Sequence, residues 1–252
     1  MIRGVWNALA FLSRLAPPPA HRKWQSGQEE DNGIAKAVPF YPVAGLLLGG
    51  LASLPALVFS VALPQISTWI SALLYVFILA WLTRGLHWDG LADLADACGS
   101  NTTGDRFWEI IKDSRIGAFG VMALIFAIAA QIIAAQACIA TGHAGTLVLA
   151  PAFARAVGIL PGRFVTPHPA STLAATTQPG IRSSASLLAL GLTLAASLTL
   201  LGPIPFLAAL GIVGVCLGIL IRIARNHGGF NGDFLGSAII AAETALLLTG
   251  GI

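Results

Sequence analysis

The sequence STWISALLYVFILAWLTRGLHWDGLADLADA, which runs from residue 67 to residue 97, joins a long apolar stretch to a short acidic one. Its first part, residues 67–86, carries Arg84 as its only charged side chain. A helix of about 20 residues is about 30 Å long, which matches the hydrocarbon core of a membrane. The stretch therefore predicts a membrane-spanning helix that ends directly at a group of carboxylates.

Apolar stretches of this kind recur along the whole chain. Of its 252 residues, 56% are hydrophobic and only 10% are charged, whereas about 25% are charged in an ordinary soluble domain. We predict an all-α, polytopic integral membrane protein with about seven transmembrane helices, which forms a single domain over residues 1–252. The spans are expected at residues 38–63, 67–86, 117–141, 146–162, 184–201, 204–221 and 234–249.

The placement of positive charge predicts the orientation of these helices. All 14 lysines and arginines fall in the N-terminal segment, in connections on one face, or inside or at the ends of helices. The turns expected on the other face, at residues 64–66, 142–145 and 202–203, contain none. Because cytoplasmic connections carry the excess of Lys and Arg, we expect a protein of the bacterial cytoplasmic (inner) membrane whose N-terminus and active site face the cytoplasm.

Residues 1–37 are expected to lie on the membrane rather than across it. The apolar run before residue 15 contains Trp6 and is flanked by Arg3 and Arg14. This combination is typical of an amphipathic helix at the level of the lipid head groups. We interpret the run as an interfacial helix in contact with membrane lipid, followed by a polar cytoplasmic loop at residues 17–33.

Three aspartates form a stripe directly after the second span. In a helix, about 100° per residue places Asp93 about 40° ahead of Asp89 and places Asp96 about 20° behind it. Carboxylates gathered in this way repel one another without a counterion, so the stripe predicts a site for a divalent metal ion. The alternative is a solvated helix face. His87 falls on the opposite side of the helix, where a packing or hydrogen-bonding role is expected.

The connection of residues 87–116 is interpreted as the catalytic segment. We expect a short amphipathic helix there that is capped by Asp105, and Lys112, Asp113 and Arg115 follow it. Magnesium usually bridges carboxylates to substrate phosphates, while Lys and Arg neutralise the remaining phosphate charge. Acids and bases together therefore indicate phosphoryl chemistry.

A second polar cluster, Asn231, Gly232 and Asp233, stands where the last span begins. Asp233 is either the N-cap of that helix or a ligand of the metal or the substrate. The three glycines around Asn231 and Asp233, at positions 228, 229 and 232, favour the ligand interpretation, because glycine lets a backbone approach a bound molecule closely. We expect this cluster, the acidic stripe and residues 112–117 to meet at one cytoplasm-facing cavity.

Two charges lie inside predicted spans, Arg155 in the fourth and Glu243 in the seventh. Charges at such positions are costly, and they usually face a cavity or each other. Two interpretations are open: Arg155 and Glu243 form a buried ion pair, or Arg155 reaches a substrate phosphate from the cytoplasmic side.

Four strings of this sequence, in their order and separation, resemble the cobalamin synthase family, also called adenosylcobinamide-GDP ribazoletransferase. They are FYPVAGLLLGG at residues 40–50, HWDGLADLADA at 87–97, KDSRIGAFG at 112–120 and GGFNGDFLGSAIIAAE at 228–243. The resemblance covers nearly the whole chain. It implies an enzyme that requires Mg²⁺, with adenosylcobinamide-GDP and α-ribazole, or its 5′-phosphate, as substrates.

The reaction that the resemblance implies is a phosphoryl transfer. A ribazole hydroxyl attacks the phosphoryl group joined to cobinamide, expels GMP and gives adenosylcobalamin or its 5′-phosphate. Together with the spacing, this assigns Mg²⁺ to Asp89, Asp93 and Asp96, with the alternative that one of them, Asp96 by preference, accepts the hydroxyl proton instead. Arg115 is expected to hold phosphate oxygens. The further candidates for substrate binding are Lys112, Asp113, Arg155, Asn231, Gly232, Asp233 and Glu243.

Two other functions are weighed against this one. A CDP-alcohol phosphotransferase also has an acidic helix at the membrane surface, but its usual pattern, DG followed by AR and later by GxxxDxxxD, is not matched here. A transporter would use Arg155 and Glu243 as a mid-membrane site, but no internal repeat is evident. Basic residues are spread over several connections, so no nucleic-acid partner is expected. The sequence leaves open whether the chain forms a homo-oligomer.

Overall fold

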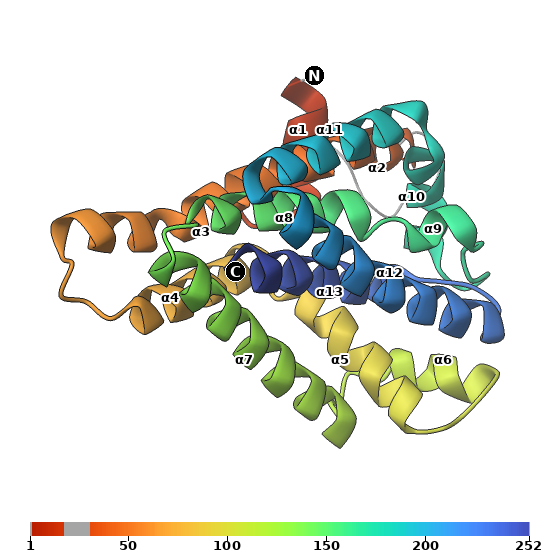
Figure 1. Ribbon diagram of the computed structural model, residues 1–252. Coiled ribbons are helices and arrows are strands. Elements are labelled where there is room, and N and C mark those ends of the chain that lie inside the picture. The colour runs from red at the N-terminus through yellow and green to blue at the C-terminus, as the bar shows by residue number, and fades with distance from the viewer. Residues whose placement is uncertain (1, 18–30, 252) are drawn as a thin grey trace.

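Helices make up most of the computed structural model, which describes residues 2–17 and 31–251 (Figure 1). In these ranges the only β-type pairing is an isolated bridge between Pro167 and Phe230. Most of the expected polar loop at residues 17–33 lies outside the described residues. The helices are α1 (Ile2–Leu12), α2 (Asp31–Ala37), η1 (Val38–Phe40), α3 (Tyr41–Ala62), α4 (Thr68–Leu82), α5 (Leu86–Gly99), α6 (Asp105–Ile111), α7 (Ala118–Ala140), α8 (Gly145–Val157), α9 (Pro161–Phe164), α10 (Thr172–Arg182), α11 (Ser184–Leu201), α12 (Pro203–Asn226) and α13 (Gly232–Gly250).

Six helical segments in the described part of the chain are long and apolar enough to cross a membrane. Two of them are continuous runs of consecutive helices, and α4 with α5 would make a seventh span that is bent by 88°. The predicted all-α, multi-pass membrane architecture is therefore confirmed. The six segments are Gly33–Ala62, Ala118–Ala140, Gly145–Phe164, Ser184–Leu201, Pro203–Asn226 and Gly232–Gly250.

The bend between α4 and α5 separates the apolar part of this pair from its acidic part. Arg84 and Gly85 both adopt positive φ angles, of 58° and 70°, a conformation that ends a right-handed helix. The N–H of Gly85 donates to the carbonyl of Ala80, which closes the last turn of α4. The chain then starts α5 in a new direction, at 88° to α4.

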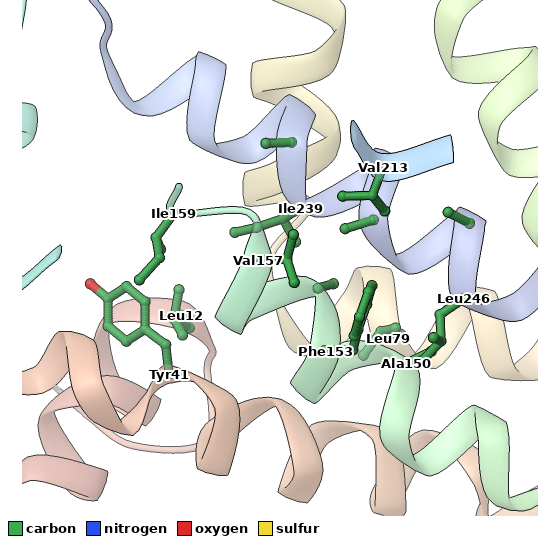
Figure 2. Packing of buried hydrophobic residues seen from close by; sticks show 14 of the residues in the cluster. Leu12, Tyr41, Leu79, Ala150, Phe153, Val157, Ile159, Val213, Ile239 and Leu246 are labelled. Carbon is green, nitrogen blue, oxygen red and sulfur yellow. The ribbon is translucent and has the colours of Figure 1, made fainter. Parts of the chain in front are cut away.

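The two innermost helices are α8 and α13, which run through the middle of the bundle (Figure 1). Figure 2 shows Phe153 and Val157 of α8 and Ile239 and Leu246 of α13 within one continuous apolar cluster. By contrast, the long helices α7, α11 and α12 are mostly exposed and carry large apolar side chains on that exposed surface. In a bilayer this surface faces lipid, which is as apolar as the side chains themselves.

The buried charges Arg155 and Glu243 contact each other. Arg155 Nη1 lies 3.4 Å from Glu243 Oε2 and also donates to the carbonyl of Pro151 at 2.9 Å. Their side chains are 0% and 3% exposed. A substrate phosphate cannot reach a guanidinium that is enclosed in this way, so the structure favours the ion-pair interpretation. We therefore leave Arg155 and Glu243 out of the substrate-binding residues.

The ion pair makes a testable contribution to stability. Replacing Glu243 with Leu leaves the Arg155 charge buried without a partner, and we expect a loss of about 3–5 kcal/mol, as is usual when one member of a buried pair is removed. The double variant Arg155→Met/Glu243→Leu should recover most of that loss. Unfolding in lipid nanodiscs measures the stability of the single and of the double variant. Equal losses in the single and double variants would show that the pair is not the relevant interaction.

Candidate functional site

The acidic stripe lies on a helix, as expected. Helix α5 carries Asp89 near its start, exposed to solvent, and Asp93 and Asp96 further along, both partly buried. The opposite side of α5 is buried and includes His87, Gly90 and Leu94. The apolar side therefore fixes α5 against the bundle.

A contact between α5 and α13 without intervening side chains brings a fourth carboxylate to this stripe. A Cβ atom at Gly90 would lie 2.8 Å from the Cα of Asp233, and one at Gly236 would lie 3.2 Å from the carbonyl oxygen of His87. The hydroxyl of Ser237 donates to the carbonyl of Gly90 at 3.2 Å. Only glycine permits this approach, and as a result Asp233 stands beside the acidic face of α5.

Asp96 is already engaged with the backbone of the next helix. Its two carboxylate oxygens accept hydrogen bonds from the N–H groups of Gly117, at 2.7 Å, and Gly120, at 2.8 Å. These are free N–H groups at the start of α7, which a carboxylate stabilises. Asp96 thereby ties α7 and the preceding residues 112–117 to α5. A position as the general base does not suit it, because both oxygens already have partners.

Asp233 is not the N-cap of α13. The cap is Asn231, whose side-chain oxygen accepts from the N–H of Asp233 at 3.2 Å. The Asn231 amide also donates to Asp233 Oδ2 at 2.6 Å, which orients the carboxylate. The N-cap alternative for Asp233 is therefore wrong, because Asn231 caps the helix. Its carboxylate stays available for a ligand.

Gly229, which precedes this cluster, lies at a close contact between two loops. Gly229 has a φ of 150°, and a Cβ atom there would lie 2.5 Å from the backbone nitrogen of His168. The next residue, Phe230, exchanges backbone hydrogen bonds with Thr166 and His168. For Gly229 the expected role in approaching a bound molecule is therefore corrected: this glycine allows two loops to pair, whereas no atom lies within 4 Å of a Cβ at Gly228.

Burial and neighbouring negative charge change the titration of the acidic face. Burial, followed by the charges of Asp89, Asp233 and Asp96, raises the pKa of Asp93 from 3.8 to about 7. The atoms that these side chains offer to a metal ion are all carboxylate oxygens, the ligands that Mg²⁺ prefers. A divalent cation would relieve the repulsion among them. In the described ranges, no three Asp, Glu, His or Cys side chains form a ready-made metal site, so the carboxylates would have to turn toward a shared ion.

The basic residues that follow α6 lie in an exposed loop. Arg115 forms a bidentate pair with Asp113, with Nη2 to Oδ2 at 2.7 Å and Nε to Oδ1 at 3.0 Å. These hydrogen bonds lower the pKa of Asp113 to about 2. Lys112 is also exposed. The structure therefore brings Asp113 together with Arg115, but it does not place either of them in direct contact with the carboxylates of α5.

Helix α6 is held by aromatic contacts that the sequence did not reveal. Trp108 stacks on His168 with ring centroids 3.9 Å apart and donates through Nε1 to the carbonyl of His227. Phe107 stacks on His227 at 3.8 Å. The expected cap Asp105 is wrong, because the N-cap is Gly104, whose φ of 60° favours glycine. In the sequence, only the adjacent Phe107 and Trp108 on an amphipathic helix could have indicated these aromatic contacts.

A cavity of about 110 Å³ adjoins Asp233 but not Asp89. It lies among α1, α3, α10 and α13 and the start of α5, and most of its wall is apolar. None of these wall residues except Gly232 and Asp233 was identified from the sequence as part of a site. Its lining comprises Phe11, Leu12, Tyr41, Leu86, His87, Ile159, Leu173, Ala174, Thr177, Ile181, Gly232, Asp233, Leu235, Gly236 and Ile239.

A bundle of apolar spans with carboxylates gathered where α5 meets α13 defines a multi-pass membrane protein with an oxygen-rich site. Comparison with known proteins is more specific. The chain belongs to the cobalamin-5-phosphate synthase family, whose model matches residues 4–251. It is thus a membrane transferase of cobalamin biosynthesis, and the CDP-alcohol phosphotransferase and transporter alternatives are not supported.

Curated relatives agree over almost the whole chain. A protein of Nitratidesulfovibrio vulgaris (strain Miyazaki F) is 42% identical over 98% of this chain and 96% of its own length. Relatives from Syntrophobacter fumaroxidans and Thiobacillus denitrificans are 36% and 34% identical, over 96% and 100% of this chain and 95% and 96% of their own lengths. All three are named adenosylcobinamide-GDP ribazoletransferase. No solved structure matches the chain.

The contact between α5 and α13 can be tested by adding one methyl group. Gly90→Ala forces its Cβ against the Asp233 backbone, and we expect a loss of about 1–3 kcal/mol of stability, as for overpacked cores, together with reduced activity. Gly50→Ala is the matched control, because no atom lies within 4 Å of a Cβ there. It should be neutral or slightly stabilising. The measurement is the melting temperature of both variants in nanodiscs. Equal melting temperatures would contradict the close contact between Gly90 and Asp233.

The raised pKa of Asp93 predicts a pH dependence of stability in the absence of metal. The folded protein holds this proton up to about pH 7 and the unfolded chain only up to about 3.8, so stability falls as the pH rises through this window. Asp93→Asn cannot ionise, so the variant does not lose stability from a buried negative charge at high pH. In EDTA the variant should therefore melt above the wild type at pH 8, and the difference should shrink toward pH 4. A constant difference at all pH values would contradict the shift.

Proposed function

We propose that this protein transfers the adenosylcobinamide phosphoryl group from adenosylcobinamide-GDP to a hydroxyl of α-ribazole or its 5′-phosphate. A bond forms between the ribazole oxygen and the phosphorus, the bond from that phosphorus to GMP breaks, and the hydroxyl proton goes to a carboxylate. The names of the relatives and the position of Asp233 beside the acidic face of α5, where the charges of Asp89 and Asp233 raise the pKa of Asp93, support this function. The latter observation carries the proposal, because pyrophosphate chemistry needs such oxygen ligands.

We assign three different roles to the acidic residues. Asp89 and Asp93 would hold Mg²⁺, which when bound neutralises charge on the pyrophosphate and on the departing GMP. Asp233 is our candidate for the proton acceptor, at Oδ1, because Oδ2 already accepts from Asn231. Asp96 positions α7 and the loop before it. This division replaces the earlier preference for Asp96 as the base.

The basic residues would bind the phosphates. Lys112 and Arg115 are exposed and sit on the loop that Asp96 ties to α5. Asp113 accepts three side-chain hydrogen bonds from Arg115 and so presets the direction of its guanidinium. An oriented guanidinium loses less conformational entropy when it binds a phosphate. We therefore assign phosphate binding to Lys112 and Arg115 and a positioning role to Asp113.

The proposed location is the inner membrane, with the site facing the cytoplasm. The α5–α6 segment, α9, α10 and the turn between α12 and α13 lie toward the same end of the bundle (right in Figure 1), opposite the turn between α3 and α4. Arg106, Arg163 and Arg182 belong to these end segments, and Lys112, Arg115 and Arg225 lie next to them, whereas the turn between α3 and α4 contains no lysine or arginine. The excess of positive charge supports a cytoplasmic position for this end.

The deciding experiment is the release of GMP by purified protein in nanodiscs, given adenosylcobinamide-GDP and α-ribazole with Mg²⁺ or with EDTA. We expect GMP and a matching amount of corrinoid product only with Mg²⁺. Asp93→Asn should lower turnover by at least about 100-fold, as is usual for a lost acid–base or metal-binding group. Mg²⁺ should also raise the melting temperature of the wild type but not of this variant.

The matched control is Glu109→Gln, which removes an exposed carboxylate whose ion-pair partner among the described residues is Arg106. It should retain wild-type turnover and the Mg²⁺-dependent melting shift. Normal turnover by a folded Asp93→Asn protein would overturn the assignment of the metal. Absence of GMP release by the wild type would overturn the proposed reaction.

A further inference from the structure

Two exposed arginines meet where the N-terminal segment contacts the end of α4. The N–H of Arg14 donates to the carbonyl of Leu82 at 2.8 Å, and Arg84 Nη2 donates to the carbonyl of Phe11 at 3.1 Å. These two hydrogen bonds join the segment after α1 to the end of α4, so both arginines belong to one contact region. Both side chains are exposed. We call Arg14 and Arg84 the arginine pair.

The arginine pair has no carboxylate partner among the described residues, whose ion pairs involve other arginines. The Arg14 guanidinium lies instead 4.5 Å from the centroid of the Trp81 ring. This cation–π contact is favourable, but it leaves the positive charge uncompensated. Two positive charges in one contact region repel each other unless an anion lies between them. The pair therefore predicts an anionic ligand, and phosphate oxygens are the acceptors that guanidinium groups match best.

An apolar strip on α4 leads away from the arginine pair. Leu73, Phe77 and Trp81 follow one another at intervals of four residues, which places them on one face of the helix. Their side chains are 53%, 63% and 52% exposed. A free phosphate ion would contact the arginines and leave this strip uncovered. A molecule with an anionic head and a long apolar chain would cover both.

The arginine pair lies at the height of the chain where lipid head groups are expected. The apolar helix α4 ends at Leu82, and Arg84 is the first charged residue after it. Arginine and tryptophan are the residues that usually lie at the level of the head groups. This end of α4 is the one away from the α3–α4 turn, so the proposed orientation places it at the cytoplasmic leaflet, which is rich in anionic lipids.

We infer that the arginine pair binds the phosphate of an anionic phospholipid, whose acyl chain lies along the strip of Leu73, Phe77 and Trp81. The phosphate oxygens accept hydrogen bonds from both guanidinium groups, and the bound lipid strengthens the contact of the N-terminal segment with α4. A lipid with net negative charge is required, because a zwitterionic head group brings its own cation. The inference does not depend on the proposed reaction, since none of these residues belongs to the proposed active site.

The first test removes the two charges. Native mass spectrometry of the full chain in mixed micelles measures how much phosphatidylglycerol and phosphatidylcholine it retains. Arg14→Gln/Arg84→Gln should lower the affinity for phosphatidylglycerol roughly five- to thirtyfold, the contribution of one to two arginines near an anionic surface. The matched control is Arg182→Gln/Arg222→Gln, which removes two exposed arginines that form no ion pair among the described residues. The control should bind phosphatidylglycerol like the wild type.

Three results would overturn the inference. They are equal affinity of the wild type for the two lipids, equal loss of phosphatidylglycerol in both double variants, and unchanged binding in Arg14→Gln/Arg84→Gln. Inorganic phosphate is added at matched ionic strength as a further arm. Displacement of the lipid by phosphate would show a site for free anions instead, whereas retention of the lipid supports the inference.

A second pair of variants separates binding from folding, which thermal unfolding checks. Arg14→Lys/Arg84→Lys keeps both charges and should retain most of the phosphatidylglycerol. Arg14→Gln alone removes a side chain that makes no hydrogen bond in the described part of the chain, so it tests the site even if the double glutamine variant does not fold. It should lower the affinity roughly fivefold. Wild-type affinity in a folded Arg14→Gln protein would contradict the assignment of the arginine pair.

Discussion

The site depends on the direct contact of α5 with α13. Gly90 and Gly236 allow the two backbones to meet, and Ser237 bonds to the carbonyl of Gly90. Because α13 is one of the innermost helices of the bundle, this contact fixes the acidic helix relative to the core. Larger side chains at either glycine would push α5 outward and separate the carboxylates of α5 from Asp233.

Charge is arranged differently in the interior of the bundle and at its end. Inside, Arg155 and Glu243 neutralise each other and are sealed from solvent. At the end, Asp89, Asp93 and Asp233 carry the same sign and are only partly buried, which raises the pKa of Asp93. An arrangement that repels itself is expected where a cation or substrate completes the site. The two groups therefore differ: the charges of the buried pair compensate each other inside the fold, and the carboxylates at the end are those to which we assign ligand binding in the proposed function.

Loop contacts hold the parts of the site at fixed distances from one another. Asp96 joins α5 to the start of α7, and Trp108 and Phe107 join α6 to the two loops that carry His168 and His227. The same loops pair with each other through the backbone of Phe230. Segments that are far apart in the sequence are thereby fixed around the cluster at residues 231–233. A mobile substrate phosphate would meet a preorganised surface, which is the condition for positioning catalysis.

The sequence by itself determined the membrane-spanning bundle, because runs of apolar residues long enough to cross a bilayer leave a chain few other folds. It also determined the acidic face of α5, because helical periodicity alone places Asp89, Asp93 and Asp96 together. Only the tertiary structure decided which partners these side chains have. It gave Asp96 to α7, made Asn231 the cap instead of Asp233, paired Arg155 with Glu243, and revealed the cavity around Tyr41 and His87. Such choices depend on contacts between residues far apart in the chain, which local periodicity and spacing do not encode.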